Sequence, residues 1–180
     1  MILGIDPGTT IMGYGVIRVH NNKPLLLVLG SLDQRKIKDH YVKISKIFDR
    51  TIQLIEEYKP IALAIESPFY GKNIQSMLIL GRAQGAAISA ALFKSVPVFE
   101  YAPRKIKQSI SGYGNASKEQ IAAFLKSILN IELKPGTLDA TDGLAAALCH
   151  YYQCNNRIKS GPSKGWKDFI KKNPGRVSGN

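Results

Sequence analysis

Two patterns of hydrophobic residues divide the chain into predicted strands and predicted helices. Short runs that are apolar throughout, or that alternate with polar residues, predict strands at residues 1–6, 12–19, 25–32, 61–65 and 96–101. Longer runs with an apolar residue about every 3.6 positions predict helices at residues 40–58, 73–93, 103–110, 118–130 and 139–155. The order is therefore three strands, a helix, a strand, a helix, a strand and then helices.

The connections between these elements favour a mixed sheet. The first three strands are joined by short turns, so we expect an antiparallel meander. The run at 61–65, Ile-Ala-Leu-Ala-Ile, has no polar alternation, which is typical of a central, parallel strand that is buried on both faces. We therefore predict an α/β protein with helices on both faces of the sheet.

The net charge of the 180-residue chain is +12, which indicates a polyanionic partner, most often nucleic acid. Residues 157–180 carry seven Lys or Arg and one acid among many Gly, Ser and Pro residues. We therefore predict a domain over residues 1–156 and a basic, flexible tail over residues 157–180.

Other features favour a cytoplasmic protein without membrane contact. No stretch approaches the roughly 18 uninterrupted apolar residues of a membrane helix, and no signal peptide is expected. Cys149 and Cys154 are five residues apart in a helical pattern and so lie on different faces. Since no further Cys or His clusters with them and His150, we expect reduced thiols and not a metal site.

Four acids stand in apolar settings. Asp6 and Glu66 each end a predicted strand, and Asp139 and Asp142 open the last helix, three residues apart on one face. Sites in α/β sheets form at the carboxyl ends of strands. If the four carboxylates converge, they form an all-oxygen site suited to Mg²⁺, and four can hold two ions about 4 Å apart for phosphodiester hydrolysis.

Each acid also has a purely structural interpretation. Asp6 before Pro-Gly is typical of a residue that caps a turn, and Glu66 of a strand end that faces solvent. Asp139 and Asp142 are typical of acids at a helix N-terminus, one of them an N-cap. The catalytic interpretation requires all four to meet.

Four segments around these acids resemble the RuvC family of Holliday-junction resolvases. They are I-L-G-I-D-P-G-T-T-I-M-G-Y-G-V-I from residue 2, L-A-I-E-S-P-F-Y-G-K-N from residue 63, V-F-E-Y-A-P-R-K-I-K-Q-S-I-S-G-Y-G-N-A-S-K from residue 98 and D-A-T-D-G-L-A-A-A-L-C-H from residue 139. The resemblance covers roughly residues 1 to 152. Gly143 departs from it, because Ala is usual there.

The resemblance implies a ribonuclease H-like fold and a homodimer. It also implies Mg²⁺-dependent resolution of four-way junction DNA by paired, symmetric nicks in recombination and repair, together with the RuvA–RuvB branch-migration complex. Asp6, Glu66, Asp139 and Asp142 match the family's catalytic metal ligands, for two Mg²⁺ ions that Mn²⁺ is expected to replace.

DNA contacts are expected from three segments. The resemblance implies that Phe69 stacks on junction bases and that Lys107 and Lys118 face the DNA near the cut. Lys72 lies beside the aromatic pair, and Arg104 opens the basic run R-K-I-K-Q, so we add both as phosphate contacts. The alternatives are a buried Phe69 and a solvated basic helix face.

Gly81, Gly85 and Ser89 form a stripe of small residues on the predicted helix 73–93. The resemblance suggests that this helix meets its twin across a dimer axis; packing on its own sheet is the alternative.

Three other functions remain open. G-I-D-P-G-T-T resembles the first phosphate loop of actin and Hsp70-type ATPases, but the chain has no second copy of the motif. A non-catalytic junction-binding protein and a ribonuclease H-like nuclease with another substrate, such as RNA–DNA hybrids, are the others.

Overall fold

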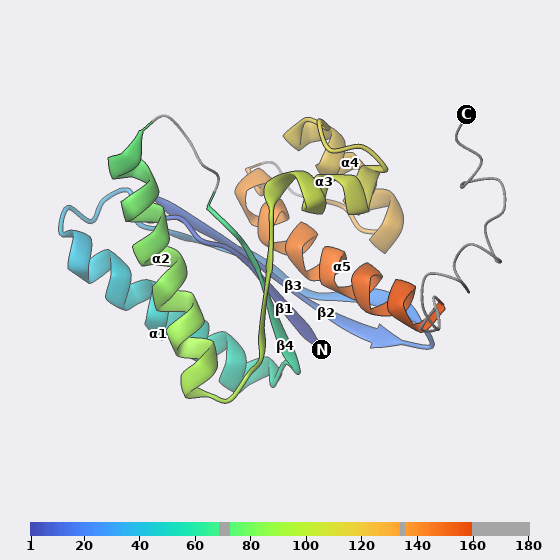
Figure 1. Ribbon diagram of the computed structural model, residues 1–180, viewed down its shortest axis with the longest axis horizontal. Helices are drawn as coiled ribbons and strands as arrows, with labels where there is room; N and C mark the ends of the chain where they lie inside the picture. The colour runs from blue at the N-terminus through green and yellow to red at the C-terminus, as the bar shows by residue number, and fades with distance from the viewer. Residues whose placement is uncertain (69–72, 134–135, 160–180) are drawn as a thin grey trace, which may run out of the picture.

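The computed structural model describes residues 1–68, 73–133 and 136–159, and it has one five-stranded sheet between two layers of helices (Figure 1). The strands are β1 (Ile2–Asp6), β2 (Ile11–His20), β3 (Lys23–Asp33), β4 (Ala62–Glu66) and β5 (Val98–Tyr101). The helices are α1 (His40–Tyr58), α2 (Ile74–Phe93), α3 (Pro103–Ser111), α4 (Lys118–Leu129) and α5 (Leu138–Lys159). The predicted α/β class and element order are confirmed.

The sheet is mixed, with the strand order β3-β2-β1-β4-β5. The first three strands form the predicted antiparallel meander, and β4 pairs in parallel with β1 and β5. The predicted strands 12–19 and 25–32 were too short, because β2 and β3 extend to a two-residue turn. Asn21 and Asn22 occupy that turn with φ of 49° and 58°, a conformation that Asn tolerates well.

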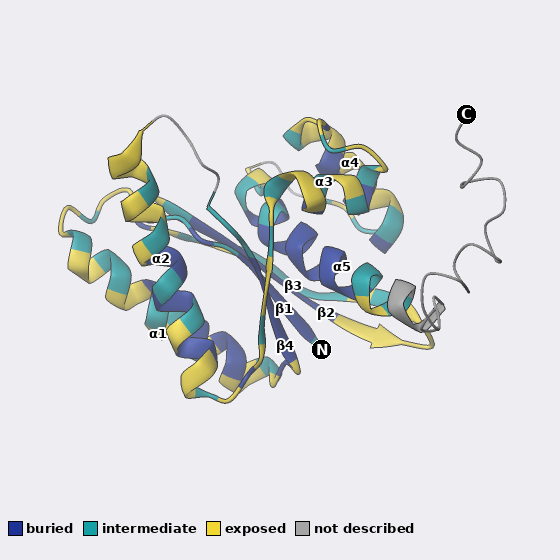
Figure 2. Cartoon of the chain, viewed as in Figure 1, coloured by how far each residue is buried: buried dark blue, intermediate teal, exposed yellow. Residues whose placement is uncertain are grey.

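The two faces of the sheet carry separate cores. Leu3, Ile5 and other strand residues pack beneath α1 and α2, while Ile2 and Ile17 pack beneath α3, α4 and α5. Alternate residues of β1 thus point to opposite faces, as expected of a central strand. Figure 2 shows that the centre of the sheet and the middle of α5 are buried.

Strand glycines let α5 lie directly on the sheet. A Cβ atom at Gly4 would come within 2.1 Å of the Gly143 carbonyl oxygen, and one at Gly13 within 2.0 Å of the Asp139 carbonyl oxygen. A Cβ atom on Gly143 would lie 2.6 Å from the carbonyl oxygen of Gly13. Larger residues therefore do not fit, and the glycine at position 143 suits the close contact in this chain.

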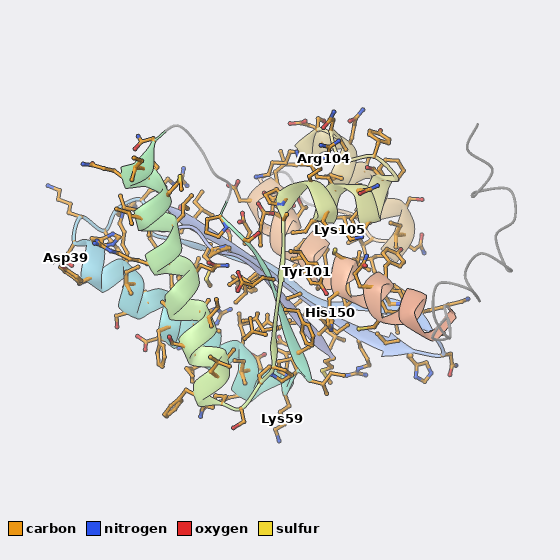
Figure 3. All side chains as sticks on the ribbon, in the orientation of Figure 1. Asp39, Lys59, Tyr101, Arg104, Lys105 and His150 are labelled. Carbon is orange, nitrogen blue, oxygen red and sulfur yellow. The ribbon has the colours of Figure 1, made fainter. Side chains whose placement is uncertain are left out.

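Helix α5 is also held from the far edge of the sheet. The Tyr101 hydroxyl on β5 lies 2.8 Å from Nδ1 of the buried His150 on α5, and the two side chains point toward each other (Figure 3). The inner strands β1 and β2 and the edge strand β5 therefore all constrain the position of α5.

Within the described part of the chain, α2 alone is long and apolar enough to meet a length-and-composition test for a membrane span, with a mean hydropathy of 1.3. Core helices of soluble proteins meet the same test. Its inner side packs against α1 and the sheet through Ala83, Ala87 and Ala91. Polar residues, among them Arg82 and Gln84, interrupt the apolar run.

Candidate active site

Two of the four predicted acids end neighbouring parallel strands. The pairing of β1 with β4 runs as far as Ile5 and Ile65, and Asp6 and Glu66 follow directly. Because the strands are parallel, both side chains lie at the same edge of the sheet.

The other two acids reach this edge through the contact between α5 and the glycines. Asp6 pairs with Gly13 across β1 and β2, and Gly13 is the residue that lies against the Asp139 carbonyl oxygen. Asp142 follows almost one turn along α5. The charges of Asp139 and Asp142 both act on the carboxyl of Asp6, and that of Asp142 acts on Glu66. The structure thus brings all four acids together.

Two lysines from α3 and α4 face the acids. Nζ of Lys118 donates to Oδ1 of Asp139 at 2.8 Å and to Oδ2 of Asp142 at 2.7 Å. Lys107 is close enough to lower the pKa of both Glu66 and Asp142. A cavity of about 360 Å³ opens here and is lined by Glu66, Pro103, Ile106, Lys107, Lys118, Ile121, Asp142 and Ala145.

The acids carry more negative charge than their surroundings neutralise. Burial, followed by the charge of Asp142, raises the pKa of Asp6 to about 6. Burial and then the charges of Asp6 and Asp142 raise the pKa of Glu66 to about 8, although Lys107 and Lys118 oppose the rise. A site of this kind favours protons or added cations.

The structural interpretations of the acids fit less well. Among the described residues, none donates a hydrogen bond to the carboxyl of Asp6, so Asp6 caps no turn there. Glu66 lines a cavity and is only partly exposed. Helix α5 begins at Leu138, so Asp139 and Asp142 lie inside the helix and neither is its N-cap, although Asp139 lies in the first turn, where the helix dipole favours an acid.

The structure describes three of the five predicted DNA-contact residues. Lys107 and Lys118 line the cavity, and Arg104 is exposed on α3 (Figure 3), where its side chain lies against Gly114. Phe69 and Lys72 lie outside the described residues.

One basic residue near the acids was missed. Arg35 follows β3, binds Asp33 through Nε and one terminal nitrogen, and is close enough to Asp139 for that charge to raise its pKa. The signal was available, because β3 of the meander ends at the same sheet edge as β1, and R-K-I-K follows it.

The donor set suits a hard divalent cation, although its members do not already surround one. Across residues 1–68, 73–133 and 136–159, no three His, Cys, Asp or Glu side chains form a group able to hold a metal ion. An oxygen of Asp139 and one of Asp142 instead accept hydrogen bonds from Lys118. Carboxylate oxygens and a shortage of positive charge are the properties of a Mg²⁺ site.

Comparison with known proteins identifies the family of this chain. The family model described as crossover junction endodeoxyribonuclease RuvC matches residues 2–150. The chain belongs to the RuvC family. The RuvC protein of Christiangramia forsetii is 55% identical over 177 residues, which cover 98% of this chain and 92% of that protein. The RuvC protein of Porphyromonas gingivalis is 51% identical, over 98% of this chain and 96% of that protein.

A solved RuvC structure has the same fold. The structure of Thermus thermophilus RuvC in complex with a Holliday junction substrate has a TM-score of 0.79 and 31% sequence identity, and covers 86% of this chain and 94% of that chain. The sheet of this chain is therefore a RuvC-type, ribonuclease H-like sheet, as the resemblance implied. The stretch matched by the RuvC family model contains all four acids and both lysines.

Proposed function

We propose that this protein is a Holliday-junction resolvase that nicks two DNA strands of like polarity at symmetric positions, in recombination and repair. Family membership supports the reaction class, and the convergence of Asp6, Glu66, Asp139 and Asp142 at one sheet edge is the observation that carries the site. Loss of one acid would have favoured a non-catalytic junction-binding protein, and all four are present.

The four acids would hold Mg²⁺, in our proposal two ions, for which Mn²⁺ substitutes. When bound, divalent ions supply activation of the attacking water and stabilisation of the leaving 3′-oxygen. The chain's own contribution is to hold the carboxylates on two strand ends and one helix, which fixes their spacing. Pro103, Ile106 and Ile121 form the apolar part of the cavity lining beside Glu66 and Asp142.

The basic groups around the acids would hold the DNA backbone. Lys107 and Lys118 line the cavity, and Arg104 and Arg35 lie exposed near it, on α3 and after β3. Cations at these positions would orient phosphates toward the carboxylates without reading sequence. Phe69 and Lys72 complete the proposed DNA-contact set, on a stretch next to Glu66 in the sequence.

A homodimer would give the two sites that symmetric nicking needs. The outer side of α2 supports it. Ile74 is 70% exposed and Leu78 is 59% exposed, and added Cβ atoms at Gly81 and Gly85 would meet nothing within 4 Å. An apolar helix face with small residues that let a second helix approach closely suits contact with a second copy. We further propose that the dimer acts in the cytoplasm with RuvA–RuvB.

The test is cleavage of a synthetic mobile four-way junction, with Mg²⁺ or with a chelator, beside linear duplex and RNA–DNA hybrid controls. We expect paired, ligatable nicks on the junction alone, and only with Mg²⁺. Preference for the hybrid would keep the metal site but replace the substrate. Binding without cleavage would indicate the non-catalytic module.

The matched variants are Asp6→Asn and Asp49→Asn. Asp6→Asn should lower the cleavage rate by roughly 10³-fold or more, because a metal-bound catalytic centre contributes several kcal/mol, while junction affinity stays nearly unchanged. Asp49 is an exposed acid on α1, so its variant should cleave at the wild-type rate. An Asp6→Asn protein that cleaves normally would refute the assignment of this acid.

A further inference from the structure

Lys118 makes two ion pairs at the centre of the acidic site. One ammonium group donates to Asp139 at 2.8 Å and to Asp142 at 2.7 Å. The side chains of all three residues are only partly exposed, at 35%, 48% and 27% for Lys118, Asp139 and Asp142. A monovalent cation of the protein itself therefore lies between two carboxylates that the proposed function assigns to metal ions.

The backbone around Lys118 is fixed by a capping box. Ser117 caps α4 by accepting a hydrogen bond from the Gln120 amide, and the Gln120 side chain accepts one from the Ser117 amide. Lys118 is then the first residue of α4, where the helix dipole disfavours a cation. The helix gains nothing from a lysine there, so the acids of α5 are what stabilise its charge. Only the long lysine side chain, and not its backbone, is free to move.

A divalent ion and the Lys118 ammonium cannot share the same oxygens. Mg²⁺ takes carboxylate oxygens at about 2.0–2.1 Å and demands near-octahedral geometry. Lys118 contacts Oδ1 of Asp139 and Oδ2 of Asp142. A divalent ion bound to the same two oxygen atoms would lie close to the ammonium group, and the two positive charges would repel each other strongly. Among the described residues, no three acids are arranged so that they could hold a metal ion. This agrees with an arrangement in which Lys118 binds the carboxylates of Asp139 and Asp142.

We propose that Lys118 is a built-in substitute cation, which holds Asp139 and Asp142 in the metal-free protein and is displaced when divalent metal binds. This inference rests on the metal site of the proposed function. The displaced ammonium remains beside the cavity that Lys107 also lines, where it can bind a DNA phosphate. Lys118 is then a positioning residue that links metal binding to DNA binding, and the linkage is reciprocal.

The first experiment measures Mn²⁺ binding to the full-length protein without DNA, by electron paramagnetic resonance of free Mn²⁺. Lys118→Met keeps the apolar stem and removes the competing charge, so its Mn²⁺ affinity should rise about tenfold over wild type. Lys118→Arg keeps the charge and can bridge both carboxylates, so it should bind Mn²⁺ no more tightly than wild type. Junction cleavage by Lys118→Met should fall even though its metal affinity rises.

Lys107→Met is the matched control. The charge of Lys107 lowers the pKa of both Glu66 and Asp142. Lys107→Met therefore removes one positive charge near the acids but keeps the two ion pairs of Lys118. The gain in affinity from Lys107→Met should be clearly smaller than that from Lys118→Met. Equal gains, or an unchanged or weaker affinity in Lys118→Met, would overturn the displacement.

The second experiment observes the ammonium group itself by ¹⁵N NMR of lysine side chains. A signal missing in Lys118→Met identifies Lys118, and it should shift during titration of wild type with Mg²⁺. A signal that stays unchanged while Mg²⁺ binds would overturn the inference and leave the metal site intact. If neither wild type nor Lys118→Met binds Mn²⁺ or Mg²⁺, the proposed metal site fails as well.

Discussion

At the scale of single residues, the raised pKa of Glu66 shows that the site has too little positive charge to balance its acids. The Glu66 carboxyl has a pKa of about 8, raised first by burial and then by the charges of Asp6 and Asp142. A carboxyl with a pKa above its usual value favours the protonated form in the folded state. The same carboxylates that suit a divalent ion therefore destabilise the metal-free fold once they are ionised.

This predicts a pH dependence of stability in chelator-treated protein. Between the ordinary pKa of 4.5 and about 8, Glu66 keeps its proton in the folded state and has lost it in the unfolded chain. Since the folded state binds more protons, the free energy of unfolding should fall as pH rises from 5 to 8. One pKa unit corresponds to about 1.4 kcal/mol, and partial hydration of the site reduces the total fall to about 1–3 kcal/mol.

Urea denaturation at fixed protein concentration measures the effect. Glu66→Gln should flatten the pH dependence and be more stable than wild type at pH 8 without metal. Glu132→Gln changes an exposed carboxyl and should leave the curve as in wild type. A wild-type curve that rises steadily from pH 5 to 8 would contradict the burial of Glu66 in a negative site.

Single residues also differ in how far the sequence could predict them. Asp6 and Glu66 were recognisable because each charge ends an apolar run. The bonds of Lys118 were not predictable, because its partners lie on another helix and the contact depends on how α4 packs against α5. Arg35 was missed because an exposed basic run carries no periodic signal of its own, and its position becomes apparent only when the strand directions of the predicted meander are considered as well.

At the scale of elements, the placement of α5 depends on glycines in the sheet, which have no Cβ atom. The glycines of β1 and β2 leave no room for a Cβ atom beneath α5, and one of them, Gly13, lies directly against the Asp139 carbonyl oxygen. The hydrophobic pattern predicted the strands and helices within a few residues. It could not predict this close contact, because glycines within a strand are equally typical of bulges.

Gly13→Ala should therefore affect both the fold and the site. The added methyl group would lie on the Asp139 carbonyl oxygen, so α5 must move away from the sheet, at a cost of about 2–4 kcal/mol. The shift would also separate Asp139 from Asp6 and weaken Mn²⁺ binding. Urea denaturation and Mn²⁺ titration measure the two effects.

Ser31→Ala is the control for this variant. Ser31 pairs with Gly13 on the neighbouring strand and is exposed, so the change should stay within about 0.5 kcal/mol. Gly13→Ala with normal stability and normal Mn²⁺ affinity would mean that α5 tolerates a wider spacing than the structure indicates.

At the scale of the whole molecule, α2 has two different sides. Its inner alanines pack on the core, and its outer side is exposed and apolar near the N-terminal end (Figure 2). The sequence showed the glycine stripe, but only the structure shows that the stripe faces away from the sheet. Packing on the chain's own sheet, the alternative for this stripe, is therefore wrong for Gly81 and Gly85.

Gly85→Arg tests the dimer that we propose on this side. The new side chain enters open space in the single chain, so the fold should persist, but it would place a charge in a close helix–helix contact. Light scattering after size exclusion should show a dimer for wild type and a monomer for Gly85→Arg. Ser45→Arg adds the same charge to the exposed side of α1 and should remain a dimer.

The monomeric variant should also lose the symmetry of cleavage. A single site can still nick a junction strand, but the two nicks would no longer be paired, so the ligatable product should decline more than total nicking. A Gly85→Arg protein that is a monomer and still resolves junctions symmetrically would contradict the need for the dimer.

The basic C-terminal segment belongs to the same scale. We propose that it adds non-specific DNA affinity to a nuclease domain that ends near residue 156. Because α5 continues to Lys159, the truncation is best placed after that residue. Residues 160–180 contain five Lys or Arg and one acid. Their removal should weaken junction binding and reduce the slope of log K against log salt by up to about 4, since each phosphate contact contributes about 0.9.

A full-length control separates charge from chain. Changing Lys164, Lys167, Lys171, Lys172 and Arg176 to Gln removes all five basic charges and keeps Trp166 and the length of the segment. If the contribution is electrostatic, this variant should match the truncation in affinity and in salt slope, and both should still make symmetric nicks. A truncation that binds junctions with wild-type affinity and slope would exclude a DNA role for the segment. Loss of affinity in the truncation alone would indicate an apolar contact through Trp166 and its neighbours.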